Sequence, residues 1–182
     1  CSLPRELILR RLTAGLRPFQ RPIVELERTR GAQLRLHLAD VDESNAALAG
    51  LQPLSACEVA LSVDLQSTRR FSVKVDHGAG QETILTCDVQ SGTLALDRTR
   101  SGDSGFSDVF AAVYTAPLAL EQGALDLRIF LDACSIEVFA QQGAIAFTDL
   151  IFPRGAEHTI SLVAEGGDPT ILALDLWPLG PA

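Results

Sequence analysis

The chain has 182 residues, of which 47% are hydrophobic, so it is long and apolar enough for one domain with a sizeable core and unlike a disordered segment. Its formal net charge is −8, from 23 acidic and 15 basic residues. This balance argues against nucleic acid and anionic membranes as partners, because both bind clustered positive charge. The apolar runs are short, and we expect no membrane span, since a span needs roughly 20 apolar residues.

Alternation of apolar and polar residues dominates the chain and predicts β-strands that bury one face each. Residues 125–132 are typical, and we expect Leu127, Ile129 and Leu131 to face the core. Turn signals rich in glycine, such as residues 77–80, separate the strands. The predicted strands cover residues 5–12, 33–39, 58–65, 71–76, 83–89, 93–97, 125–132, 144–152, 160–164 and 172–176.

Only residues 22–30 look helical, with Pro22 in the first turn and Gly31 just beyond the end. Short strands at this spacing leave no room for the helices that a parallel α/β fold requires. We therefore expect an all-β fold: an antiparallel β-sandwich of the jelly-roll or concanavalin-like kind, with one short helix near residues 22–30. Residues 1–182 would form a single domain.

Two features predict that the chain belongs to something larger. The sequence contains no methionine and opens directly in a strand-like segment, which is typical of a piece of a longer polypeptide. The long polar loop at residues 98–112 carries Phe106 and Phe110. A long loop with embedded aromatic side chains usually packs on another surface.

The cysteines do not indicate a metal site. Cys1, Cys57, Cys87 and Cys134 form no CxxC pair, and no histidine lies at ligand spacing from any of them. Two disulfides are arithmetically open, but a domain of this size does not need them. Because Cys57, Cys87 and Cys134 sit in strand-like apolar surroundings, we expect them to be buried thiols.

No catalytic constellation stands out. Asp132 and Glu137 flank a turn and are the best local candidates for a glycosidase carboxylate pair. The simpler interpretation is an Asx turn at Asp132 and a charge on a wet strand face at Glu137. The three histidines, His37, His77 and His158, accompany no GxSxG elbow, and we expect surface, strand-end or sheet-face positions for them.

The sequence gives weak support for ligand binding. The glycine turns at residues 77–82 and 165–169 do not match the phosphate-binding pattern GxxxxGK[ST]. A sugar-binding face would present coplanar aromatic rings, yet only 5% of the residues are aromatic. Trp177 and Tyr114 are therefore interpreted as packing residues or rim contacts rather than as a sugar platform.

Residues 127–153, LRIFLDACSIEVFAQQGAIAFTDLIFP, read as strands separated by a short turn and by a Gln-Gln-Gly turn. The segment resembles the pattern LRIFxDxSSVEVFxNDGxxxxTxxIFP in the C-terminal β-sandwich of glycoside hydrolase family 32 (levanases, invertases and exo-inulinases). Further matches follow in the family's order along nearly the whole chain. They are Leu3-Pro4-Arg5-Glu6-Leu7, Pro22-Ile23-Val24-Glu25-Leu26, Asp97-Arg98-Thr99-Arg100-Ser101-Gly102, Ala116-Pro117-Leu118 and Trp177-Pro178-Leu179.

The resemblance implies a five-bladed propeller ahead of this sandwich, with hydrolysis of β-fructosides such as sucrose, inulin or levan as its activity. In the family, the catalytic residues are the Asp of W-x-N-D-P, the Asp of R-D-P and the Glu of E-C, all in the propeller. None of these motifs occurs here. The only asparagine, Asn45, precedes Ala46; the only Asp-Pro follows Gly167; and Glu-Cys is absent.

The resemblance therefore predicts a non-catalytic module that stabilises or packs against the catalytic propeller of the same polypeptide. Fructan or sucrose would be bound through that parent enzyme. The alternative is a lectin-like module that itself binds fructan or another carbohydrate. We expect no catalytic, cofactor-binding or metal-binding residue in this chain and no cofactor. The fructoside cleaved, a secreted or cytoplasmic location, and a homodimer of the fragment stay open.

Overall fold

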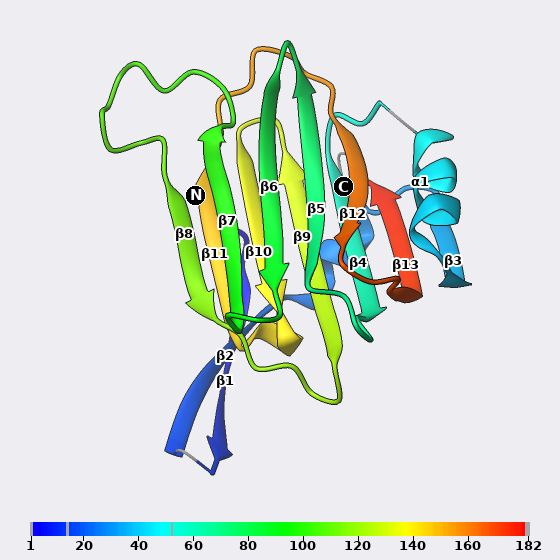
Figure 1. Cartoon of the computed structure of the whole chain (residues 1–182). Helices are drawn as coiled ribbons and strands as arrows, with labels where there is room; N and C mark the ends of the chain where they lie inside the picture. The colour runs from blue at the N-terminus through cyan, green and yellow to red at the C-terminus, as the bar shows by residue number, and fades with distance from the viewer. Residues whose placement is uncertain (1, 14, 52, 181–182) are drawn as a thin grey trace.

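Two antiparallel β-sheets face each other in the computed structural model, which describes residues 2–13, 15–51 and 53–180 (Figure 1). Every pairing between neighbouring strands is antiparallel. The arrangement confirms the predicted all-β antiparallel sandwich. The assignment of the whole chain to one domain stays a prediction.

One sheet has six strands and joins the middle of the chain to its C-terminal part. Its strands are β3 (Leu34–Ala39), β4 (Cys57–Asp64), β9 (Ala124–Asp132), β10 (Ser135–Ala140), β11 (Ile145–Leu150) and β13 (Thr170–Pro178). They lie in the order β11-β10-β9-β4-β13-β3, so β9 and β4 are central and β13 lies next to the edge strand β3. The segment with the alternating leucines, β9, pairs with β4 on one side and with β10 on the other.

The second sheet has five strands and lies in front in Figure 1. Its strands are β5 (Arg70–Gly78), β6 (Gln81–Asp88), β7 (Thr93–Arg100), β8 (Val113–Pro117) and β12 (Thr159–Glu165), in the order β12-β5-β6-β7-β8. Strand β8 was not predicted, because its sequence shows no clear alternation of apolar and polar residues. Residues 151–158 connect β11 of the six-stranded sheet to β12 of the five-stranded sheet.

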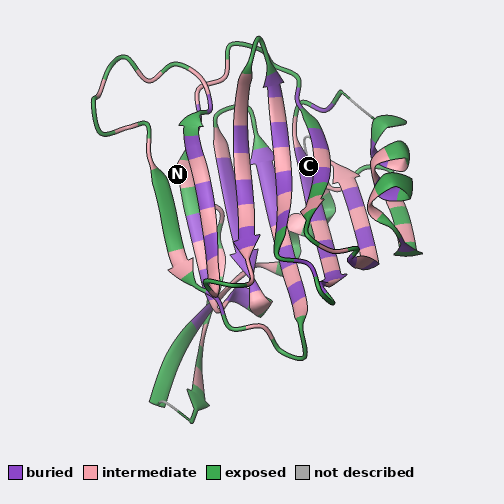
Figure 2. Ribbon diagram, viewed as in Figure 1, coloured by how far each residue is buried: buried purple, intermediate pink, exposed green. Residues whose placement is uncertain are grey.

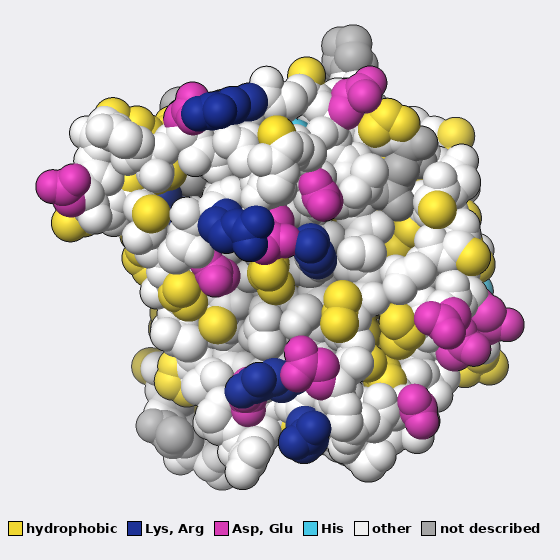
Figure 3. All heavy atoms as spheres, turned by 45° about the horizontal axis from the view of Figure 1, so that its top comes forward, with side chains coloured by type: hydrophobic (Ala, Val, Ile, Leu, Met, Phe, Trp, Pro, Cys, Tyr) yellow, Lys and Arg dark blue, Asp and Glu magenta, His cyan; other side chains and the backbone are white. Residues whose placement is uncertain are grey.

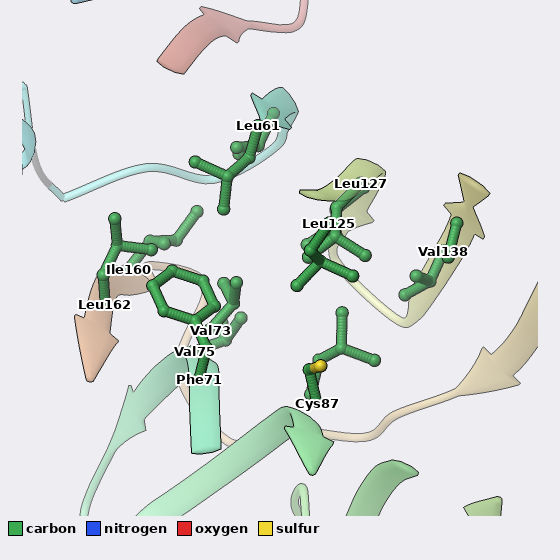
Figure 4. Packing of buried hydrophobic residues seen from close by; sticks show 14 of the residues in the cluster. Leu61, Phe71, Val73, Val75, Cys87, Leu125, Leu127, Val138, Ile160 and Leu162 are labelled. Carbon is green, nitrogen blue, oxygen red and sulfur yellow. The ribbon is translucent and has the colours of Figure 1, made fainter. Parts of the chain in front are cut away.

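The core lies between the two sheets, where the apolar sides of the alternating strands meet. Figure 2 shows buried residues recurring as stripes along the strands of the five-stranded sheet. The predicted inward residues of β9, Leu127, Ile129 and Leu131, are all buried, which confirms that prediction. Figure 4 shows Phe71 of β5 pointing toward Leu61 of the opposite sheet.

The predicted helix is present at the expected position, but the structure contains a second helix that was not predicted. The predicted segment forms a 3₁₀ helix, η1 (Val24–Thr29). An α-helix, α1 (Val41–Ala49), was missed although Asp40 and Glu43 form a capping box at its start. The Asn45 side chain of α1 donates to the Leu162 carbonyl at 2.9 Å and accepts from its N–H at 2.7 Å. Helix α1 thereby satisfies backbone groups on the edge strand β12.

A separate two-stranded hairpin, β1 (Arg5–Leu12) and β2 (Gly15–Pro22), projects from the sandwich at the lower left of Figure 1. The sequence predicted β1 but not the arginine- and proline-containing β2. The backbone of the hairpin passes close to Gly143, a turn residue with φ +92°, at Gln20. A Cβ atom on Gly143 would lie 1.9 Å from the Gln20 carbonyl oxygen, so the two backbones meet where only glycine fits.

Candidate functional site

Two carboxylates are buried on the outer face of the six-stranded sheet, the side away from the core. Glu58 of β4 is 0% exposed and Glu137 of β10 is 3% exposed. In the strand register both lie beside Phe130 of β9, so the three side chains form one row across the sheet. A buried carboxylate requires donors, and the first thirty residues supply most of them.

Glu58 is held by two arginines. Arg30 donates from Nε and Nη2 to the two carboxylate oxygens, each at 2.8 Å, and Arg128 donates from Nε at 2.6 Å. The bidentate geometry is the strong form of this interaction. The hydrogen bond to Glu58 raises the pKa of Arg30, and the Arg30 guanidinium lies 4.0 Å from the ring centroid of Trp177. Both oxygens of Glu58 are therefore paired, whereas the buried Arg128 Nη2 has no hydrogen-bond partner among the described residues.

The structure places the candidate pair, Asp132 and Glu137, in different surroundings. Both carboxylate oxygens of Glu137 are occupied, one by the Leu3 N–H at 2.5 Å and the other by Arg5 and the Thr148 hydroxyl. The expectation that Glu137 lies on a wet face was wrong, because the N-terminal segment covers it. Asp132 is exposed and accepts from the N–H of the next residue, Ala133, at 2.8 Å. An Asx turn would instead use the N–H two residues on, so this bond does not match the Asx-turn interpretation.

Two of the three histidines lie at strand ends, as predicted, but they are buried together rather than exposed at the surface. His77 is 2% exposed and His158 is 0% exposed, and their Nδ1 atoms lie 3.0 Å apart. The pair joins the end of β5 to the crossover that precedes β12. The third histidine, His37, lies exposed on β3, as its sheet-face interpretation predicted.

The hydrogen bonds assign a neutral tautomer to each ring. The Thr83 hydroxyl donates to Ser101 Oγ at 2.7 Å, so it accepts from His77 Nε2 at 2.8 Å. His77 Nδ1 then accepts from His158 Nδ1, and the buried His158 Nε2 has no partner among the described residues. Burial lowers the pKa of His77 to about 4, helped by the neighbouring His158, and burial also lowers the pKa of His158. The cluster contains no carboxylate bonded to either ring.

The two buried cysteines of the described residues are not activated nucleophiles. Cys57 and Cys87 are buried, as predicted, whereas Cys134 lies exposed in the turn between β9 and β10 and corrects that part of the prediction. Burial raises the pKa of the Cys57 thiol to about 12 and that of the Cys87 thiol to about 11. Reactive cysteines require a lowered thiol pKa, so the buried pair packs as small apolar residues.

The polar aromatic residues do not form a sugar platform. Trp177 lies on β13 under Arg30, and Tyr114 lies on β8 in the other sheet, so their rings share no face. The Tyr114 hydroxyl accepts from Arg98 Nη2 at 2.9 Å. This confirms that both act as packing or rim residues.

The long loop packs against other residues, as predicted, through its phenylalanine side chains. It is shorter than predicted, because β7 extends to Arg100. Phe110 stacks on Phe152 with ring centroids 5.3 Å apart, and Phe106 lies 4.7 Å from Phe110. The buried Arg98 lies 4.1 Å from the Phe110 ring centroid and forms an ion pair with Asp149 at 3.1 Å. Phe106 is nevertheless 64% exposed, so one side of this aromatic cluster faces solvent.

A groove of about 890 Å³ runs between the hairpin, η1 and the outer face of the six-stranded sheet. Its floor is made of small side chains on the paired strands β4 and β13, namely Ala60, Ser62 and Ala173. Hydrogen bonds occupy some of its charged groups, such as Arg21, which donates to the Gln142 carbonyl at 3.0 Å. The carboxylates that line it belong to Glu6, Glu25, Glu27, Asp126 and Asp175.

Other classes of site find no support in the described part of the chain. Its histidines, cysteines, aspartates and glutamates form no group of three that could hold a metal ion. No described helix has the length and apolar character to cross a membrane. On the face in Figure 3, the basic side chains lie next to acidic ones rather than forming one continuous basic surface.

The sequence analysis did not identify the arginines that pair with the buried carboxylates of Glu58 and Glu137. Arg5 pairs with a residue 132 positions away and Arg128 with one 70 positions away, so no local spacing shows these contacts. One compositional signal was present, since Lys74 is the only lysine among the 15 basic residues. Arginine is the residue that suits buried, bidentate ion pairs.

Comparison with known proteins gives consistent matches over this chain. A family model described as "Glycosyl hydrolases family 32 C terminal" matches residues 25–178. The chain is 36% identical to a levanase of Bacillus subtilis (strain 168) and 32% identical to a levanase of Bacillus sp. (strain L7), with 98% of the chain covered in each case. It spans only 27% and 20% of those two relatives.

A solved structure has the same fold. The crystal structure of exo-inulinase from Aspergillus awamori superposes with a TM-score of 0.80 and 24% sequence identity. The match covers 98% of this chain and 35% of that protein. At this identity the likeness establishes the β-sandwich fold alone.

Replacing Glu58 by glutamine is expected to lower the free energy of unfolding by about 3–5 kcal/mol, because it leaves Arg30 and Arg128 without their shared carboxylate. Urea unfolding followed by circular dichroism measures the change. Glu27→Gln is the matched control, since Glu27 pairs with the same Arg30 but is 49% exposed, and it should cost less than about 1 kcal/mol. Equal effects of the two substitutions would contradict the buried-pair account.

The free energy of unfolding should fall as the pH drops from about 6.5 toward about 4, since the unfolded histidines bind protons that the folded His77 does not. Both lowered pKa values act in the same direction, so this stability is present above pH 6.5 and lost on acidification. His77→Gln removes part of the pH dependence, whereas His37→Gln, at the exposed position, leaves it unchanged. Urea titrations at pH 7.5, 6 and 5 compare the three proteins, and parallel curves for wild type and His77→Gln would refute the assignment.

Proposed function

This chain belongs to the C-terminal domain family of the family 32 glycosyl hydrolases, and we propose that it is the non-catalytic β-sandwich of an enzyme that hydrolyses β-fructosides. The observation that carries the proposal is the match of residues 25–178 to that family model, together with the small share of the levanases that the chain spans. In this proposal the remainder of the polypeptide supplies a catalytic propeller, and the sandwich packs against it and stabilises it.

The state of the carboxylates supports a non-catalytic role. A glycosidase needs one carboxyl group with a raised pKa and a second carboxylate across the scissile bond. Among the described acidic residues, burial raises the pKa of Asp149, but the Arg98 charge opposes that shift from 3.1 Å away. The deeply buried Glu58 and Glu137 are occupied by arginine donors. These buried groups serve the fold.

The exposed side of the aromatic loop supports packing against a further domain. Phe106 and Val109 are 64% and 82% exposed, and Tyr114 on β8, which is 41% exposed, joins this surface through Arg98, whose guanidinium lies beside Phe110. The loop and β8 lie together at the left of Figure 1. Contiguous exposed apolar groups mark contact surfaces. We place part of the contact with the catalytic domain there.

The isolated chain is expected to release no fructose from sucrose, inulin or levan above the buffer rate, whereas the longer polypeptide should turn over at a rate typical of enzymes, about 1–1,000 per second. Fructose release is measured with both proteins at equal molar concentration. Turnover by residues 1–182 alone would overturn the proposal.

A second candidate function is carbohydrate binding by the sandwich itself, and the groove of about 890 Å³ favours it. The carboxylates of Glu6, Glu25 and Asp126 line the groove and accept no hydrogen bond from the described residues. Free carboxylates beside arginine and amide donors are groups that can hydrogen-bond sugar hydroxyls. Phe139 also lines the groove but is 3% exposed, so aromatic stacking adds little.

Calorimetric titration of the chain with levan and inulin oligomers distinguishes the two functions. If the groove binds fructan, heat is released at millimolar ligand, and Asp126→Ala weakens binding at least tenfold. Asp132→Ala, at an exposed carboxylate outside that groove, is the matched control and should leave the affinity unchanged. Absence of heat at millimolar ligand would remove the binding function.

A further inference from the structure

The hairpin β1–β2 is a sheet of only two strands and pairs with no other described strand. It extends away from the body of the sandwich, and its projecting part is largely exposed in Figure 2. An isolated two-stranded hairpin is marginally stable in water. Such an element needs either support from the sandwich or a partner of its own.

One face of the hairpin has support from the sandwich. Arg21 donates to the Gln142 carbonyl and to Gln142 Oε1, each at 3.0 Å. Phe19 is 6% exposed and lies under the Arg10 guanidinium, 4.6 Å from the ring centroid. In the strand register these residues alternate with those of the opposite face. The supported face is thus tied to the turn after β10.

The opposite face is covered at its base, where Arg5 binds Glu137, and is apolar and exposed toward the tip of the hairpin. Leu7, Leu9 and Leu16 are 72%, 65% and 57% exposed. The register places Leu9 directly opposite the exposed Pro18 and places Leu16 opposite Arg11, so these side chains share one face. A leucine face of this kind is a contact surface rather than a solvated one.

The free edges of the hairpin differ in a way that favours addition of a strand to β1. Strand β2 contains Pro18 and Pro22, which have no N–H to donate, whereas β1 contains no proline. An edge strand without proline and with apolar side chains is a template for pairing with another chain segment. The open surface therefore consists of the leucine face and the β1 edge together.

The hairpin lies outside the residues that match the family model of the sandwich. The family model for the C-terminal domain begins at residue 25, just after β2 ends, while the two levanases match 98% of the chain. The hairpin thus lies outside the sandwich model but within the matched levanase sequence. Those relatives are also several times longer than this chain.

We infer that the leucine face of the hairpin and the edge of β1 dock against the part of the polypeptide that precedes residue 1, which adds strands or a sheet face to them. This inference rests on the proposed function, since the preceding part would be the catalytic domain. The matching surface is apolar at its centre and carries a carboxylate at its rim, because the exposed Arg11 lies opposite Leu16 on the leucine face. The hairpin is then structurally a part of the preceding domain.

The test compares three forms of the longer polypeptide: wild type, the double variant Leu7→Arg/Leu9→Arg, and the control Leu38→Arg. Leu38 is 76% exposed on β3, far from the hairpin, so the control introduces the same side chain at a similar exposure. Hydrogen exchange is measured over residues 5–22 and thermal unfolding is followed by calorimetry. Residues 1–182 alone provide the reference for an undocked hairpin.

In the wild-type polypeptide the amides of Leu7 and Leu9 should exchange at least tenfold more slowly than in residues 1–182 alone. The double variant loses that protection and lowers the unfolding temperature of the preceding domain, while Leu38→Arg changes neither. Equal exchange in the long and short wild-type proteins would overturn the inference, as would a double variant that behaves like wild type. A protected hairpin that becomes exposed on dilution of a dimer would assign the face to a second copy and also overturn it.

These readouts do not depend on turnover. A wild-type polypeptide that protects the hairpin but releases no fructose contradicts the proposed function alone. An active polypeptide with an unprotected hairpin contradicts the docking inference alone.

Discussion

The structure depends on the need to neutralise two carboxylates on the outer face of the six-stranded sheet. Glu58 and Glu137 have almost no exposure to water, and a buried charge is tolerated only when it is paired and hydrogen-bonded. Arg30 and Arg5 satisfy them, and both arginines come from the first thirty residues. The N-terminal segment is thereby held across a sheet face that would otherwise be wet, and it forms one wall of the large groove.

The same pairing gives the buried acidic residues of the strands a structural role, because arginine side chains occupy the carboxylates of Glu58 and Glu137. The buried histidines are unsuited to proton transfer, because their rings bond to each other and to Thr83 with no bonded carboxylate. The polar groups inside this chain hold segments together that are far apart in the sequence.

Features with a local cause were predictable from the sequence, and features created by distant contacts were not. The alternation of apolar and polar residues predicted the core strands and the inward side of β9, because a strand with one buried face carries apolar residues at every second position. Helix α1 had a local signal in the Asp40–Glu43 capping box, which was overlooked. The burial of His77 and His158, 81 positions apart, and the ion pair between Arg5 and Glu137 arise only from the tertiary fold. The groove is likewise made by segments that the chain brings together from far apart.

The close approach of Gly143 to Gln20 bears on how motion passes between the hairpin and the sandwich. A joint made by long side chains can change rotamer and swing, whereas two backbones in contact at a glycine have little freedom to pivot. A flexible linker would only keep two domains near each other, at a concentration set by its length. A hairpin held at its base by a backbone contact instead fixes the orientation of the sandwich relative to any domain bound to the hairpin. A single methyl group at position 143 would be enough to change the angle between the hairpin and the sandwich.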